Sequence, residues 1–220
     1  MVKTLALKSI LKEVKEELTQ KDGVREVAQQ NMRKATSLSK QSILLMHQKK
    51  YEKARKSIEN AKEIIAKLQA SAKEYPSIIY SGMFSAALQE YAEANIFQGL
   101  IQEGHFVTPK EVNVPALDYV LGLADVIGEY RRLVLDVLRE GDAEKGEKCL
   151  KTMDEIYIEL MAMDEAHMLV PGLRRKCDIA RRIIETTRGD ITQEVRRKSL
   201  ENYLKQFEQA QRQARQPRKG

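Results

Sequence analysis

The sequence contains few of the residues that interrupt regular structure. Its 220 residues include 11 glycines and 5 prolines, and long stretches contain neither. A sheet protein needs a turn signal about every 8–12 residues, so this scarcity argues against a sheet. We therefore expect an all-α fold.

The features of exported and membrane proteins are also absent. The two cysteines, Cys149 and Cys177, form no CxxC pair and no disulfide framework. No long apolar run is present, and the first 18 residues carry charges every few positions instead of an apolar signal region. These absences predict reduced thiols, a cytoplasmic location and no membrane partner.

Charge is unevenly distributed along the chain. Residues 171–220 carry 14 Lys and Arg against 6 Asp and Glu, whereas the whole chain has a net charge of +6. The first 170 residues are therefore slightly acidic. A basic C-terminal segment favours an anionic partner, most commonly nucleic acid, although a merely solvated charged surface would have the same composition.

Apolar residues recur with the helical period over nearly the whole chain. The spacing predicts one domain over 1–209, with about seven helices, and a basic, disordered tail over 210–220. Pro171-Gly172 and Gly189-Asp190 are expected to separate the last helices. The expected helices run to His47 and then over 51–73, 77–103, 116–140, 143–167, 172–188 and 191–209.

Two stretches are almost free of charge in a chain that is 32% charged. Between Tyr75 and Gln102 the only charged residues are Glu90 and Glu93, which are three apart and share a helix face. A helix that is apolar on nearly every face is buried in a core or an interface.

The second such stretch, 112–128, contains only Asp118 and Asp125, and Glu129 follows four residues after Asp125. An unpaired buried carboxylate costs several kcal/mol. The spacing leaves three explanations open: basic residues from other helices neutralise the carboxylates, the helix edges meet solvent, or the pairs converge on divalent cations.

Other metal and catalytic signatures are missing. A ferritin-like di-iron site needs a Glu-x-x-His on each of two helices. The three histidines are His47, His105 and His167, and only Asp164-x-x-His167 approaches that spacing. The sequence also has no P-loop, no GxSxG motif and no zinc-binding spacing.

Four segments resemble the translin family, and specifically its Trax (translin-associated factor X) branch. LQEYAEANIFQGLI at 88–101 is similar to a Trax helix with two catalytic glutamates, and DYVLGLADVIGEYRRL at 118–133 is similar to the DYLLGVADLTGE signature. RKATSLSKQSILLMHQ at 33–48 and TTRGDITQEV at 186–195 match an early helix and a C-terminal turn of the family. The resemblance covers about 24–200.

The resemblance implies which carboxylates are functional. Carried over position by position, the acidic site consists of Glu90, Glu93, Asp125 and Glu129. Translin proper is the RNA-binding, non-catalytic branch, and it has an uncharged or basic string where this chain has Glu90 and Glu93. The acidic set places this chain with the nuclease branch.

Two departures from the family pattern affect the expected RNA contacts. The loop between the two uncharged stretches is shorter than in Trax, and IYSGMFSAA replaces the basic stretch that translin has before the acidic helix. RNA contacts must therefore come from elsewhere, and the candidates are Arg33, Lys40, Arg131 and Arg132. Arg132 matches a family arginine.

The resemblance implies a Mg²⁺- or Mn²⁺-dependent endoribonuclease that assembles into a closed oligomer, which in this family is an octamer. We expect a homo-oligomer that binds single-stranded or short duplex RNA, and the family also allows a translin-like partner chain. Two alternatives stay open: a non-catalytic, translin-like protein that binds single-stranded nucleic acid, and a helical protein–protein scaffold.

Overall fold

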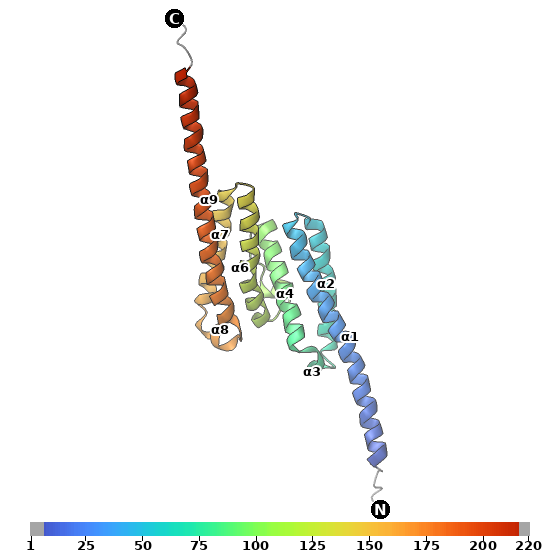
Figure 1. Ribbon diagram of the computed structural model, residues 1–220. Coiled ribbons are helices and arrows are strands. Elements are labelled where there is room, and N and C mark those ends of the chain that lie inside the picture. The colour runs from blue at the N-terminus through green and yellow to red at the C-terminus, as the bar shows by residue number, and fades with distance from the viewer. Residues whose placement is uncertain (1–6, 216–220) are drawn as a thin grey trace, which may run out of the picture. The chain divides into compact units, whose positions relative to one another are not determined.

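The computed structural model describes residues 7–215, apart from the side chains of 164–166 and 213–215. Within that range the chain forms nine α-helices and one π-helical segment, with no strand (Figure 1). The predicted all-α fold is confirmed; three short helices are additional, and the last two expected helices form one continuous helix. The helices form two compact units, and the division between the units falls between Leu123 and Ala124, inside a helix.

The first unit is built on a helical hairpin. Helix α1 (Leu7–His47) packs against α2 (Tyr51–Ser71) and α4 (Gly82–Gln98). The turn between α1 and α2 is closed by Lys49 at φ 59°, whose amide donates to the Met46 carbonyl. The α1 residues on this seam alternate steps of four and three, as coiled-coil seams do. They are Ala28, Met32, Ala35, Ser39, Ser42 and Met46.

The expected helix over 77–103 is divided into three parts. Pro76 occupies the first turn of α3 (Pro76–Ile79), and the extended backbone of Ser81 then starts α4. After α4 the chain continues as a π-helix, η1 (Gly99–Glu103). Gly99 is required there, because a Cβ would lie 2.9 Å from Val107 Cγ1 and 3.0 Å from the His105 carbonyl oxygen.

A short, well-capped connection leads from η1 to α6. Helix α5 (Pro109–Val112) begins with a capping box between Thr108 and Glu111. Helix α6 (Ala116–Arg139) follows, and its Tyr119 hydroxyl donates to the Val107 carbonyl at 2.6 Å. The start of α6, up to Leu123, belongs to the first unit.

The second unit contains the rest of α6 and three further helices: α7 (Ala143–Met161), α8 (Asp164–Leu169) and α9 (Leu173–Arg215). Asp142 caps α7 by accepting from the Lys145 amide at 2.9 Å. The expected helix over 143–167 is interrupted at Ala162 and Met163, between α7 and α8.

The expected joint at Gly189-Asp190 was wrong, because α9 runs through both residues. Thr187 and Ile191 are both fully buried, and α9 packs against α7. Continuous packing thus outweighs the cost of about 1 kcal/mol for a glycine inside a helix. Helix α9 also includes residues 210–215 of the predicted tail, and 216–220 lie outside the described residues.

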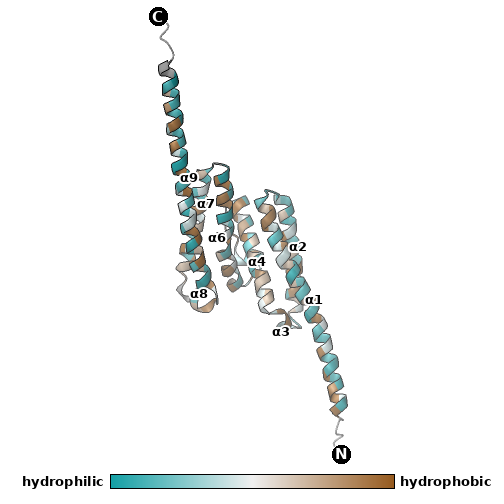
Figure 2. Cartoon of the chain, viewed as in Figure 1, coloured by the Kyte–Doolittle hydropathy of each residue, from teal (hydrophilic) through white to brown (hydrophobic). Residues whose placement is uncertain are grey.

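The outer ends of α1 and α9 carry apolar residues that face solvent. Figure 2 shows these residues recurring along both helices. Exposed apolar residues include Leu7, Leu11, Val14 and Leu18 on α1, and Leu200, Tyr203, Leu204 and Phe207 on α9. No described helix is both long enough and apolar enough to cross a membrane.

Candidate acidic and RNA-contact site

Helix α4 holds the first carboxylate pair, within the first unit. This helix carries no other charged residue because most of its residues between Phe84 and Phe97 are buried. Glu93 is itself buried, with 7% of its surface exposed. The Glu90 side chain is 26% exposed, and its Oε1 lies 3.2 Å from Lys40 Nζ on α1.

Helix α6 holds the second pair, in the second unit. Asp125 and Glu129 are four residues apart and partly exposed, so they share one helix face. The Asp125 carboxylate accepts a hydrogen bond from the Lys176 ammonium in the first turns of α9. Asp125, Arg175 and Lys176 also line a hollow of about 210 Å³ between α6 and α9.

Two of the three explanations for the lone carboxylates therefore apply in part. Lysines from distant helices neutralise Glu90 and Asp125, and both carboxylates also reach solvent. The sequence pattern did not predict the contact of Lys176, although this lysine belongs to the basic C-terminal segment. Spacing could not reveal it, because Lys176 is 51 residues from Asp125.

Metal binding at the four carboxylates stays a prediction. Among the described residues no group of three or more His, Cys, Asp or Glu stands together as a cation site. The donor chemistry fits a hard divalent cation, because each pair offers carboxylate oxygens one helical turn apart. The part-exposed Glu90 and Asp125 are the members that a cation from solvent would reach first.

The four basic residues predicted to contact RNA differ in their surroundings. Arg33 and Arg132 are exposed. Lys40 is exposed but pairs with Glu90. Arg131 is only 21% exposed and forms an ion pair with Asp190 of α9, so its guanidinium helps to hold α6 against α9. Of the two α6 arginines, Arg132 is thus the better placed for an external anion.

A buried polar network lies next to the first pair. Asp118 is 6% exposed and accepts hydrogen bonds from the Ser85 hydroxyl and, at 3.4 Å, from Gln89 Nε2. Burial raises the pKa of Asp118, while the two hydrogen bonds act in the opposite direction. Ser85, Gln89 and Glu93 are spaced by four along α4, so the network and Glu93 share a helix face.

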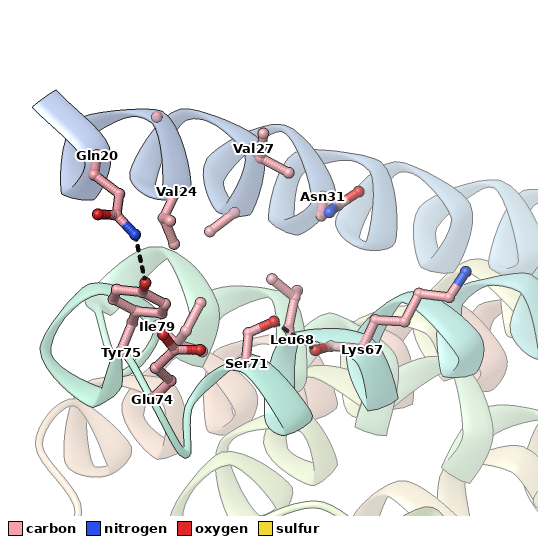
Figure 3. A pocket seen from close by; sticks show the side chains of 12 residues that line it. Gln20, Val24, Val27, Asn31, Lys67, Leu68, Ser71, Glu74, Tyr75 and Ile79 are labelled. Carbon is pink, nitrogen blue, oxygen red and sulfur yellow. Dashed lines mark hydrogen bonds between the residues drawn. The ribbon is translucent and has the colours of Figure 1, made fainter.

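A separate apolar groove lies between α1 and the end of α2 (Figure 3). It encloses about 520 Å³, and Val24 and Leu68 face each other across it. The Gln20 amide donates to the Tyr75 hydroxyl at 3.5 Å at one end. None of the four predicted carboxylates lines this groove.

The fold and the site define an all-helical protein with paired carboxylates on two helices that are otherwise nearly uncharged. Comparison with known proteins agrees with this class. The profile of the Translin family matches residues 23–187. An uncharacterised protein of Methanocaldococcus jannaschii is 33% identical over 193 residues, which cover 87% of this chain and 85% of that protein. The chain therefore belongs to the translin family.

Solved structures with the same fold include the crystal structure of AfC3PO. It is 34% identical and has a TM-score of 0.75, over 84% of this chain and 96% of that one. The structure of an AfC3PO–duplex RNA complex matches with 34% identity and a TM-score of 0.74, over 84% and 95%. Apo-NeC3PO, at 24% identity and a TM-score of 0.76 over 88% and 98%, shows the fold alone.

Proposed function

We propose that this chain is a Mg²⁺- or Mn²⁺-dependent endoribonuclease of the Trax branch, acting as a homo-oligomer. The observation that carries the proposal is the placement of Glu90, Glu93, Asp125 and Glu129 as two pairs on two helices with almost no other charge. The relative AfC3PO has been solved with duplex RNA, which supports RNA as the ligand of this chain.

The chain's own residues would divide the work as follows. Glu90 and Asp125 would present part-exposed carboxylate oxygens to the cation. In its absence Lys40 neutralises Glu90 and Lys176 neutralises Asp125. A bound divalent cation would polarise the phosphoryl oxygen and lower the pKa of its water toward neutrality. Arg132 lies three residues after Glu129, on the same side of α6, where its guanidinium would bind a phosphate of the RNA.

A non-catalytic, nucleic-acid-binding function is the second candidate. The ion pairs of Glu90 with Lys40 and of Asp125 with Lys176 favour it, because carboxylates that are already neutralised do not need a metal. In this alternative the lysines and carboxylates hold helices together, and the basic residues of α9 bind RNA without cleaving it.

A nuclease assay separates the two candidates. Purified full-length protein is incubated with single-stranded and duplex RNA, with Mn²⁺ or with EDTA, beside a Glu90→Ala variant. The proposal expects Mn²⁺-dependent internal cleavage that the variant lacks. RNA that is bound but never cut would establish the non-catalytic alternative. Absence of RNA binding would reject both candidates and leave the protein–protein scaffold as the remaining alternative.

A further inference from the structure

Arginine is concentrated in the second unit. Residues 1–123 contain 15 Lys and 3 Arg, whereas 124–220 contain 7 Lys and 13 Arg. Both side chains carry one positive charge, so a need for solubility does not favour one over the other. A guanidinium differs from an ammonium because its planar fork donates to two oxygens of one carboxylate or phosphate. Within the described residues, four of the 13 arginines pair with a carboxylate of the chain: Arg131, Arg139, Arg188 and Arg197.

Four other arginines lie near the start of α9, where they are exposed and form no ion pair with a described residue. Residues seven apart lie on the same side of an α-helix, so the four form two rows. Arg174 and Arg181 form the outer row. Arg175 and Arg182 form the hollow-side row, because Arg175 lines the hollow between α6 and α9. Two exposed carboxylates between the rows weaken the positive field of both rows alike, Asp178 and Glu185.

Small residues on both helices leave the hollow open. Ala124 and Gly128 line it from α6, and Ala180 lines it from α9. A Cβ on Gly128 would meet no atom within 4 Å, so this position opens onto free space. Ile179, which is 43% exposed, adds an apolar wall, and Asp125 lines the same hollow. The hollow of about 210 Å³ therefore combines apolar walls with a carboxylate and has an arginine at its edge.

We infer that the hollow binds one ribose of the RNA backbone, and that Arg175 and Arg182 bind the phosphates on its two sides. The two residues are about 10 Å apart along the helix axis, and their long side chains can converge on neighbouring phosphates. The apolar wall at Ile179 suits the C–H edge of the sugar, while each guanidinium donates to two phosphate oxygens. Such contacts read no base edges, so binding is independent of sequence.

The inference rests on the proposed function, because it places the RNA backbone beside Asp125, one of the proposed metal ligands. It names the part of the RNA that the second unit binds and the residues that position it. Lys176 keeps its contact with Asp125 in this arrangement. The outer row does not line the hollow and has no part in the binding.

The two arginine rows provide a matched pair of variants. Arg175→Gln with Arg182→Gln should lower the affinity for a labelled single-stranded RNA by about tenfold or more, measured by fluorescence anisotropy in EDTA, which keeps the RNA intact. The slope of log affinity against log salt should become shallower by about 1.4, because two phosphate contacts are lost. Arg174→Gln with Arg181→Gln removes the same charge from neighbouring exposed positions and should lower affinity by less than about threefold.

A graded series at Gly128 tests the hollow without changing any charge. Gly128→Ala leaves most of the hollow open and should change RNA affinity by less than about twofold, whereas Gly128→Leu fills it and should lower affinity by about fivefold to tenfold. The salt dependence should stay that of the wild type in both variants, since the arginines are intact. Circular dichroism melts verify that each variant folds.

The outcomes distinguish this inference from the proposed function. Equal losses of affinity in the two arginine variants, or full affinity of Gly128→Leu, would overturn the inference even if the wild type cleaves RNA. A wild type that binds RNA without cleaving it, with the loss confined to the hollow-side row and to Gly128→Leu, would reject the nuclease and support the ribose site. A wild type that binds no RNA would overturn both.

Discussion

Gly122 on α6 lies so close to Gln89 on α4 that a Cβ atom on Gly122 would be 2.6 Å from the Gln89 carbonyl oxygen. The same atom would lie 3.0 Å from the Glu93 amide nitrogen. The backbones of α4 and α6 are therefore in close contact at Glu93, the buried glutamate of the first carboxylate pair. A side chain at residue 122 would have to push α4 away and would move Glu93 with it.

Gly122→Ala should lower the free energy of unfolding by about 1–3 kcal/mol, the usual cost of overpacking. Chemical denaturation with urea measures it. Gly128→Ala is the matched control on the same helix, because a Cβ there meets nothing within 4 Å. It should stabilise the chain by about 0.4–1 kcal/mol through the lost freedom of the unfolded state. Equal effects of the two substitutions would contradict the close approach.

Asp118 should make stability fall as the pH rises. Burial raises the folded-state pKa of Asp118 above its ordinary value of 3.8, so the folded chain holds the proton more tightly than the unfolded chain does. The free energy of unfolding therefore falls as the pH rises from the unfolded-state pKa to the folded-state pKa of Asp118, and it stays lower at neutral pH. Asp118→Asn should melt at the same temperature as wild type or higher at pH 7, and this advantage should shrink toward pH 4.

A control variant separates charge from hydrogen bonding at this position. Asp118→Ala leaves the Ser85 hydroxyl without its carboxylate acceptor, which should cost about 1–3 kcal/mol, whereas the Gln89 amide still donates to Ser85 Oγ at 3.1 Å. Melting curves of both variants between pH 4 and 8 provide the measurement. An asparagine variant as unstable as the alanine variant would mean that the charge itself stabilises α4 against α6.

The four proposed metal ligands should behave alike in activity. Glu90→Gln, Glu93→Gln, Asp125→Asn and Glu129→Gln should each reduce Mn²⁺-dependent cleavage by on the order of 10²–10³, which corresponds to several kcal/mol of transition-state stabilisation. RNA binding and fold should survive. The melting temperature of the Glu93→Gln variant in metal-free buffer should be no lower than that of the wild type. Variants that lose stability but keep activity would reject the nuclease.

The protein should be a homo-oligomer, and an octamer is the size that the family resemblance implies. Light scattering at micromolar concentration and several salt concentrations gives its mass. The apolar stripe on the outer turns of α1 faces solvent within its own unit. Leu11→Lys with Leu18→Lys should therefore reduce the assembled mass without changing helicity, whereas Lys12→Ala on the same turns should not. A monomeric wild type would refute the expectation.

RNA binding should weaken steeply with salt, because lysines and arginines that contact phosphates release counterions from the RNA. The basic surplus lies in 171–220. A chain ending at residue 209 should bind RNA modestly less tightly and still cleave it. Affinities measured across a series of KCl concentrations test both statements, and binding that ignores ionic strength would contradict them.

Much of the secondary structure could be predicted because helical periodicity and breaking residues act locally. The first two expected helices and the one over 116–140 agree with α1, α2 and α6 within a few residues. The prediction failed at Gly189, where buried Thr187 and Ile191 carry α9 past the glycine. The helix-propensity cost of a glycine, about 1 kcal/mol, is smaller than the free energy gained by burying several side chains.

The helical fold and the helix faces that carry the carboxylates could be predicted from the residues alone, because both depend on residues within a turn or two of each other. The contacts of those carboxylates depend on how the helices pack. Lys40 and Lys176 reach Glu90 and Asp125 from other helices, and Gly122 brings the backbones of α4 and α6 together beside Glu93. These relationships join residues far apart in the chain, so packing sets them and helical spacing does not.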